Sequence, residues 1–232
     1  MALRPLTKDA ELDALRRLDT CTVSNAIETF EVRLRNTGFA NASIRCMFED
    51  FPPMLGYAAT ARLRTGDPPI AGGTYHDRAD WWNNILTIPS PRIAVIEDID
   101  DRPGIGAFIG DMHAAILRAL GCVGYVTNGA VRELPRVRDL SLQLFAGSVA
   151  VSHAYAHLFD FGTSVHVGGL EVNPGDLLHG DRHGLLKVPG EIVSEIPAAA
   201  EKVQRKEQEV IGFCSSPDFS INALRELIEK LK

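Results

Sequence analysis

Apolar residues in the centre of the chain change their spacing in a way that predicts two strands separated by a helix. The segments 92–97 and 122–127 are short, continuous apolar runs typical of buried strands. Between them, residues 112–120 carry apolar side chains at helical spacing, and Gly121 ends that helix. A strand, a helix and a strand in succession predict a parallel pair joined by a crossover helix, and therefore an α/β fold.

Weaker patterns extend this prediction to both sides of the centre. Thr7 is the expected cap of a helix over 8–19, and a second helix is expected over 23–30 before an irregular stretch at 31–53. Residues 56–65 alternate as a strand does, and 81–86 have helical spacing. Further strands are expected at 142–145, 164–167, 170–172, 177–179 and 185–188, and helices at 195–210 and from the turn at 215–218 to Lys232. We therefore expect an α/β domain with N-terminal helices over 1–190, followed by a C-terminal helical extension over 191–232.

Composition and charge argue against a nucleic-acid partner and against a membrane-spanning protein. The 232 residues, 45% of them hydrophobic and 23% charged, are typical of one substantial globular domain. A net charge of −6 without a Lys/Arg-rich run argues against nucleic acid as a partner, although Arg132, Arg136 and Arg138 could form a local basic pocket. The sequence has no signal-peptide core and no apolar run of membrane-spanning length, so we expect a cytoplasmic protein without a membrane partner.

A glycine and an acid stand at the start of the predicted central helix, in the segment Gly110-Asp111-Met112-His113. A helix N-terminus offers unpaired N–H groups and the positive end of the helix dipole, and glycine lets a ligand approach the backbone. The amides of Met112 and His113 could therefore hold a substrate carboxylate. An ordinary helix cap explains Asp111 equally well from this segment alone.

A second charged pair, Arg132-Glu133, follows the predicted strand 122–127 and the turn Asn128-Gly129. Ligands of α/β proteins gather at the carboxyl edge of the sheet, where this pair is expected. Arginine suits a carboxylate or an enolate oxygen, and glutamate is a ligand for a hard cation. A solvated ion pair on a loop is the alternative. Taken with Asp111, the pair indicates a divalent metal that binds a small keto acid.

These motifs resemble one protein family. The residues that carry the resemblance are Gly110-Asp111, Gly121, Gly124, the segment 128–133 (Asn-Gly-Ala-Val-Arg-Glu) and a second block at 167–178 that continues through 180–186. They resemble the family of RraA-like proteins and 4-hydroxy-4-methyl-2-oxoglutarate/4-carboxy-4-hydroxy-2-oxoadipate aldolases, from about residue 19 to 189. The resemblance implies a three-layer α/β fold related to phosphohistidine swivelling domains. It also implies homotrimers or homohexamers with active sites at subunit interfaces.

The resemblance to the aldolases also implies roles for individual residues. Residues 110–113 would be the pyruvyl-binding loop, Arg132 would hold the substrate and the developing enolate, and Glu133 with Asp111 would serve a Mg²⁺ or Mn²⁺ ion. The family's aldolases have Asp where this chain has Glu133. The expected function is therefore a metal-dependent lyase that cleaves a 4-hydroxy-2-oxo acid to pyruvate, with oxaloacetate decarboxylation as a side activity. A non-catalytic regulator of the RraA type and a lyase for another oxo acid remain alternatives.

Other candidate residues are weaker. Glu207 could reach a neighbouring subunit's site, although a solvated helix face is the simpler interpretation. Asp176 and Asp181 are expected to cap turns, and Trp81 and Trp82 to anchor a core or an interface. Five further histidines share no metal-ligand spacing: His153, His157, His166, His179 and His183. The scattered cysteines are expected to be reduced, mostly buried thiols: Cys21, Cys46, Cys122 and Cys214.

Overall fold

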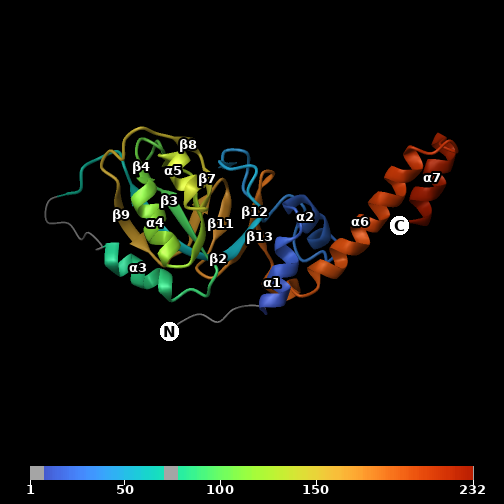
Figure 1. The fold of residues 1–232 in the computed structure, drawn as a ribbon, viewed down its shortest axis with the longest axis horizontal. Coiled ribbons are helices and arrows are strands. Elements are labelled where there is room, and N and C mark those ends of the chain that lie inside the picture. Colours follow the sequence, from blue (N-terminus) through green and yellow to red (C-terminus); the bar gives the residue numbers. More distant parts are fainter. Residues whose placement is uncertain (1–7, 71–77, 232) are drawn as a thin grey trace.

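The protein folds around one large mixed sheet, in a computed structural model that describes residues 8–70 and 78–231. The sheet has eight strands in the order β1-β7-β5-β3-β2-β12-β13, with β9 pairing β2 as well (Figure 1). The strands are β1 (Arg45–Cys46), β2 (Met54–Arg64), β3 (Arg92–Asp98), β5 (Cys122–Thr127), β7 (Gln143–Ala146), β9 (His157–Phe161), β12 (Leu177–Asp181) and β13 (Gly184–Val188). The predicted α/β class is confirmed, whereas the finer assignment to the swivelling domains stays a prediction.

The centre of this sheet is parallel, as the central pattern predicted. β2, β3, β5 and β7 run parallel to one another, with Ile93 opposite Gly124 in the β3–β5 pair. Between β3 and β5 in sequence lies helix α4 (Asp111–Ala119), which packs against β5. Most residues of β3 and β5 are buried, because both faces of a parallel sheet are covered.

A second, three-stranded parallel sheet positions the candidate site, and the sequence did not predict it. Its strands are β4 (Ala107–Ile109), β6 (Ala130–Val131) and β8 (Ser148–Val149), in that order. Ile109 lies opposite Val131 in the β4–β6 pair. The carboxyl ends of β4 and β6 therefore lie side by side. Gly110 directly follows β4, and Arg132 directly follows β6.

Helices α1 (Asp9–Arg16) and α2 (Thr20–Glu28) lie beside β12 and β13, away from α4 (Figure 1). The first helix stops at Arg16, earlier than predicted, and its predicted cap Thr7 lies outside the described residues. The second begins at Thr20 rather than at residue 23, because the Asp19 side chain caps it by accepting the Thr22 N–H at 2.8 Å.

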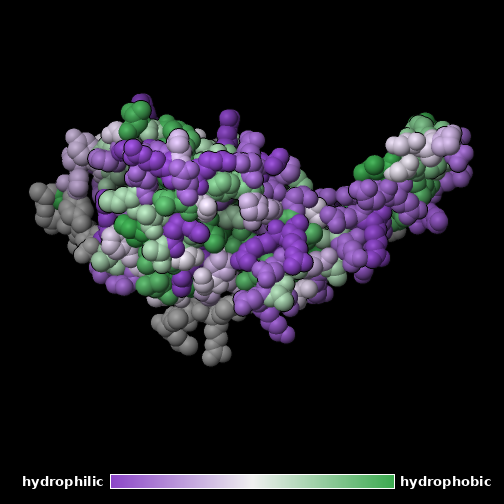
Figure 2. All heavy atoms as spheres, viewed as in Figure 1, coloured by the Kyte–Doolittle hydropathy of each residue, from purple (hydrophilic) through white to green (hydrophobic). Residues whose placement is uncertain are grey.

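The C-terminal helices extend away from the sheet. Helix α6 (Ile196–Cys214) packs its first turns on α2, and α7 (Ile221–Lys230) folds back on its far end (Figure 1). Polar side chains cover most of this arm, and apolar side chains gather at its tip (Figure 2). The division at residues 190 and 191 stays a prediction. Among the described residues no helix is both long and apolar enough to cross a membrane.

The remaining elements are short, and several correct the sequence-based expectations. Helix α3 (Arg78–Leu86), strands β10 (Val165–Val167) and β11 (Leu170–Val172) match predicted segments, whereas α5 (Leu134–Asp139), the short helix η1 (Gly190–Ile192) and β9 were not predicted. The expectation of mostly buried cysteines is wrong. All four thiols are free, but Cys21 and Cys214 are exposed, Cys46 is half-buried and only Cys122 is buried.

Candidate active site

The two charged motifs meet where β4 and β6 end. Glu133 directly follows Arg132 and has a positive φ of 57° at the start of α5. Its carboxylate accepts two hydrogen bonds, one from the Asp111 backbone N–H at 3.0 Å and one from Arg132 Nη2 at 2.6 Å. A non-glycine residue in the left-handed region is uncommon and costs free energy, and such conformations cluster at functional sites.

Asp111 is the first residue of α4, with Gly110 at the N-cap. Its Oδ1 accepts the Met112 backbone N–H at 2.7 Å, and its Oδ2 accepts a hydrogen bond from Arg136 Nη1 at 3.2 Å. These hydrogen bonds, from Met112 first and then Arg136, lower the pKa of Asp111. Asp111 is therefore ionised at neutral pH. The amide of Met112 is occupied by this carboxylate, so a ligand can use it only after Asp111 turns away.

A pocket of about 320 Å³ opens over this cluster. All six predicted site residues line it: Gly110, Asp111, Met112, His113, Arg132 and Glu133. Sequence reasoning missed the rest of the wall, which comes from Arg78, Ala107, Phe108, His153 and Ala156. Arg78 begins α3, far from the motifs in sequence, so no local pattern could have placed it here.

His113 forms one wall of the pocket as a buried, neutral imidazole. Its Nδ1 lies 2.8 Å from the Phe108 carbonyl oxygen, and its Nε2 lies 3.3 Å from Arg78 Nη1. Because a guanidinium can only donate, Nε2 accepts and Nδ1 carries the proton. Burial, together with the positive charge of Arg78, lowers the pKa of His113. The ring also stacks on Phe108, with centroids 4.8 Å apart, which fixes its orientation.

The donor set of the pocket suits a hard divalent cation. Asp111 and Glu133 present two carboxylates at one wall, and Arg132 and Arg136 balance their charge. Mg²⁺ and Mn²⁺ take one or two protein carboxylates and complete their coordination with water or substrate oxygens, for which the open pocket has room. The residues present therefore fit such an ion.

The structure separates other candidates from the site. Arg138 pairs with Asp50 and lies over the rings of Phe48 and Phe51, so it forms no common basic pocket with Arg132. Glu207 accepts a hydrogen bond from Asn25 Nδ2 at 3.2 Å in its own chain.

The turn-capping and core predictions hold. Asp176 accepts the Asn173 N–H, and Asp181 accepts the His183 N–H. Trp81 is fully buried and packs edge-on against Phe108, so it belongs to the core.

Comparison with known proteins confirms the resemblance read from the motifs. The model of the RraA-like family, described as Aldolase/RraA, matches residues 20–186 of the chain. The chain therefore belongs to the RraA-like family.

Individual relatives are distant. A protein of Halalkalibacterium halodurans, provisionally named 4-hydroxy-4-methyl-2-oxoglutarate aldolase, is 25% identical over 126 residues, which are 54% of this chain and 59% of that protein. An uncharacterized protein of Methanocaldococcus jannaschii is 25% identical over 134 residues, 56% of this chain. The matches span less than two thirds of these curated relatives, 59% and 64% of their lengths.

Solved structures support the fold. An uncharacterized protein from Pseudomonas syringae pv. tomato superposes with a TM-score of 0.73 at 22% identity, covering 99% of this chain and 97% of its own. The Streptomyces coelicolor protein RraAS2, described as an unusual member of the RNase ES inhibitor RraA family, gives a TM-score of 0.67 at 19% identity, covering 89% of this chain and 97% of its own. At these identities the likeness concerns the fold alone.

Proposed function

We propose that this protein is a divalent-metal-dependent carbon–carbon lyase that cleaves a 4-hydroxy-2-oxo acid, such as 4-hydroxy-4-methyl-2-oxoglutarate, to pyruvate and a second carbonyl compound. The observation that carries the proposal is the convergence of Asp111, Arg132 and Glu133 on one pocket at the N-terminus of α4. A pure interaction scaffold has no need for two carboxylates and an arginine that line one pocket. The regulator alternative lacks such a supporting observation.

Arg132 binds the carboxylate and the 2-oxo oxygen of the substrate in this mechanism. A guanidinium has five N–H donors, and the Glu133 contact uses one, so donors remain for the substrate. Cleavage breaks the bond between C3 and C4, and its electron pair moves to C3 and onto the 2-oxo oxygen as the pyruvate enolate. Arg132 faces the charge that develops on this oxygen, which lowers the barrier.

Asp111 and Glu133 would hold the Mg²⁺ or Mn²⁺ ion. When bound, the ion supplies Lewis-acid polarisation of the 2-oxo group. Asp111 is ionised and borders the pocket, so it is positioned to hold the water that accepts the C4 hydroxyl proton. C4 then becomes the carbonyl carbon of the second product, and C3 of the enolate takes up a proton to give pyruvate. Oxaloacetate would yield the same enolate by loss of CO₂, so decarboxylation follows as a side activity.

We further propose that the protein works as a homotrimer or homohexamer with its pocket near a subunit interface. Large apolar side chains are exposed around the pocket: Met112, Val149, Val151 and Tyr155. Val149 pairs with Val131 next to Arg132, and Val151 and Tyr155 flank the pocket residue His153. Exposed apolar side chains gathered around a site are typical of surfaces that another subunit covers. Light scattering of the purified protein tests this, and a monomer at working concentration would contradict it.

The experiment that tests the function measures pyruvate release from 4-hydroxy-4-methyl-2-oxoglutarate and from oxaloacetate, with Mg²⁺, with Mn²⁺ and with EDTA. Pyruvate that depends on metal and disappears with EDTA supports the lyase. Metal binding without pyruvate from either compound would move the proposal to another oxo acid. If the protein neither binds metal at Asp111 and Glu133 nor releases pyruvate, the proposal is overturned in favour of a regulator.

A further inference from the structure

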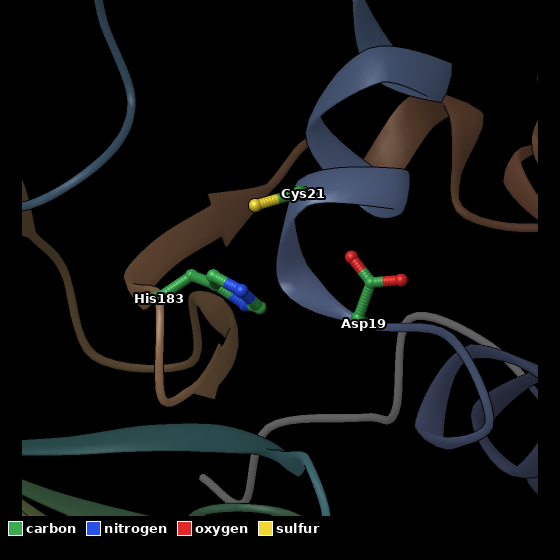
Figure 3. Close-up of side chains that lie close together, drawn as sticks. All are labelled: Asp19, Cys21 and His183. Carbon is green, nitrogen blue, oxygen red and sulfur yellow. The ribbon is translucent and has the colours of Figure 1, made fainter. Parts of the chain in front are cut away.

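Three potential metal ligands come together outside the candidate active site. Asp19 is the N-cap of α2, Cys21 lies in its first turn, and His183 lies in the turn between β12 and β13. One ligand atom of each, a carboxylate oxygen, Sγ and a ring nitrogen, lie within 4.8 Å of one another. Figure 3 shows the three side chains pointing into one space between the helix and the hairpin. The segments are some 160 residues apart in sequence, so no spacing motif could reveal them.

A buried carboxylate contacts the His183 imidazole and orients its ring. Asp181 is 5% exposed, and its Oδ1 lies 3.0 Å from His183 Nδ1 and accepts the His183 backbone N–H at 2.8 Å. A neutral His183 that donates its Nδ1 proton to Asp181 leaves the Nε2 lone pair free. Ligating histidines in proteins commonly have this arrangement, with a carboxylate on the other ring nitrogen.

The same Asp181 holds the other half of the cluster. Its Oδ2 accepts the Thr20 backbone N–H at 2.8 Å, which ties the first turn of α2 to the hairpin. Thr20 also bonds the buried His179, with 3.0 Å between Oγ1 and Nδ1. Both ligand-bearing segments are therefore fixed to each other before any ion binds, and such preorganisation lowers the cost of binding.

Electrostatics at this position favour a cation. Asp19 accepts hydrogen bonds from the Thr22 N–H at 2.8 Å and from the Thr22 hydroxyl at 2.7 Å, which fix the orientation of its carboxylate. A carboxylate oxygen that accepts one hydrogen bond keeps a second lone pair for a ligand. Asp19 and Asp181 together create a negative field, which a divalent ion would neutralise.

We propose that Asp19, Cys21 and His183 form a binding site for a thiophilic divalent cation of the Zn²⁺ type. Thiolate, imidazole and carboxylate are the three donor types that Zn²⁺ takes in proteins, and three protein ligands leave a fourth position for water. Binding forms the Sγ–metal bond and releases the Cys21 thiol proton to solvent. The site differs in chemistry from the all-oxygen donors of Asp111 and Glu133, which suit Mg²⁺. A bound ion would clamp α2 to the β12–β13 hairpin.

The test uses the purified protein of 232 residues, stripped of metal with EDTA and dialysed. Zn²⁺ affinity is measured by competition with a chromogenic chelator, and Co²⁺ is added separately as a spectroscopic probe. We expect one Zn²⁺ per chain at this site with a Kd of about 1 µM or tighter. The cobalt form should show a sulfur-to-cobalt charge-transfer band, and Zn²⁺ should raise the Tm because it binds only the folded chain.

Variants assign the ligands. Cys21→Ser and His183→Gln should each weaken Zn²⁺ binding at least about tenfold, and Cys21→Ser should abolish the cobalt charge-transfer band. Both side chains are exposed, so these variants should fold, which circular dichroism verifies. Cys214→Ser, an exposed thiol on α6, and Glu133→Gln in the pocket should leave Zn²⁺ affinity unchanged. Absence of Zn²⁺ binding by the folded wild type, or undiminished binding by the Cys21 and His183 variants, would overturn the proposal.

Discussion

The Glu133 carboxylate accepts the Asp111 backbone N–H at 3.0 Å, so the residue that follows β6 and Arg132 caps the helix that follows β4. This bond joins the two motifs that the sequence presents separately. It also places a carboxylate where a helix N-terminus would attract an anionic ligand. Glu133 is thus both a structural cap and the candidate metal ligand, and the two roles can be separated by substitution.

Glu133→Gln should weaken activation by Mg²⁺, because it removes the negative charge but keeps the length of the side chain. We expect the Mg²⁺ concentration for half-maximal pyruvate release to rise at least about tenfold. Glu133→Asp is the matched control, since it keeps the charge, loses one methylene and tolerates the positive φ of 57° better. It should retain metal-dependent activity. An unchanged Mg²⁺ titration in the Gln variant would place the metal ligand elsewhere.

Gly110→Ala should reduce activity with little loss of stability. A Cβ at this position would lie 2.4 Å from Glu133 Oε2, so the flexible carboxylate must move away from the Asp111 N–H. The backbone at Gly110 is extended, with φ −139°, and accepts alanine without strain. We expect kcat/KM for pyruvate release to fall at least about tenfold, with a change of less than about 1 kcal/mol in the free energy of unfolding.

The control for this variant is Gly212→Ala on α6, where an added Cβ meets nothing within 4 Å. Its activity should equal that of the wild type. Full activity in the Gly110→Ala protein would show that the position of the Glu133 carboxylate is unimportant for turnover.

Arg132→Ala should abolish measurable turnover while the protein stays folded. The variant loses the cation that faces the developing enolate, and removal of one such donor costs about a hundredfold or more in kcat. Arg138→Ala is the comparison variant, because Arg138 pairs with Asp50 outside the pocket and should not affect pyruvate release. Thermal unfolding of both variants checks the fold. Normal turnover without Arg132 would remove its assigned role.

The sequence predicts the central fold well because the pattern there is strong. Strands β3 and β5 and helix α4 agree with their predicted segments within one or two residues, and the parallel pairing follows from their order. Each motif alone was compatible with an ordinary cap or ion pair. Their convergence depends on the β4–β6 pair, whose strands of three and two residues are too short to give a periodic signal.

The parts that sequence could not predict depend on contacts between distant segments. Arg78 reaches His113 from the start of α3, and His183 reaches Cys21 across the α2–hairpin contact. Cys21 was expected to be buried because cysteine commonly is, yet it lies exposed in the first turn of α2. Such partners come from tertiary packing, which the local pattern of residues does not encode.

His113 makes stability depend on pH below neutrality. Its pKa in the folded protein is lower than the ordinary value of 6.5, so the unfolded chain binds the proton more readily. The free energy of unfolding should therefore be constant above this value and fall as the pH decreases below it. Each such histidine contributes a slope of at most about 1.4 kcal/mol per pH unit. The buried His179, whose pKa is also lowered, adds a second contribution of the same sign.

His113→Asn isolates the first contribution, because an amide can still donate to the Phe108 carbonyl but has no proton to gain in this range. Urea unfolding at several pH values between about 7.5 and 5.5 should give a shallower slope for this variant, with the His179 part remaining. Gly212→Ala on α6, which removes no titratable group, should keep the wild-type slope. A variant that loses the His113 imidazole and yet shows the wild-type pH dependence would place the acid-sensitive group elsewhere, with the buried His179 as the next residue to replace.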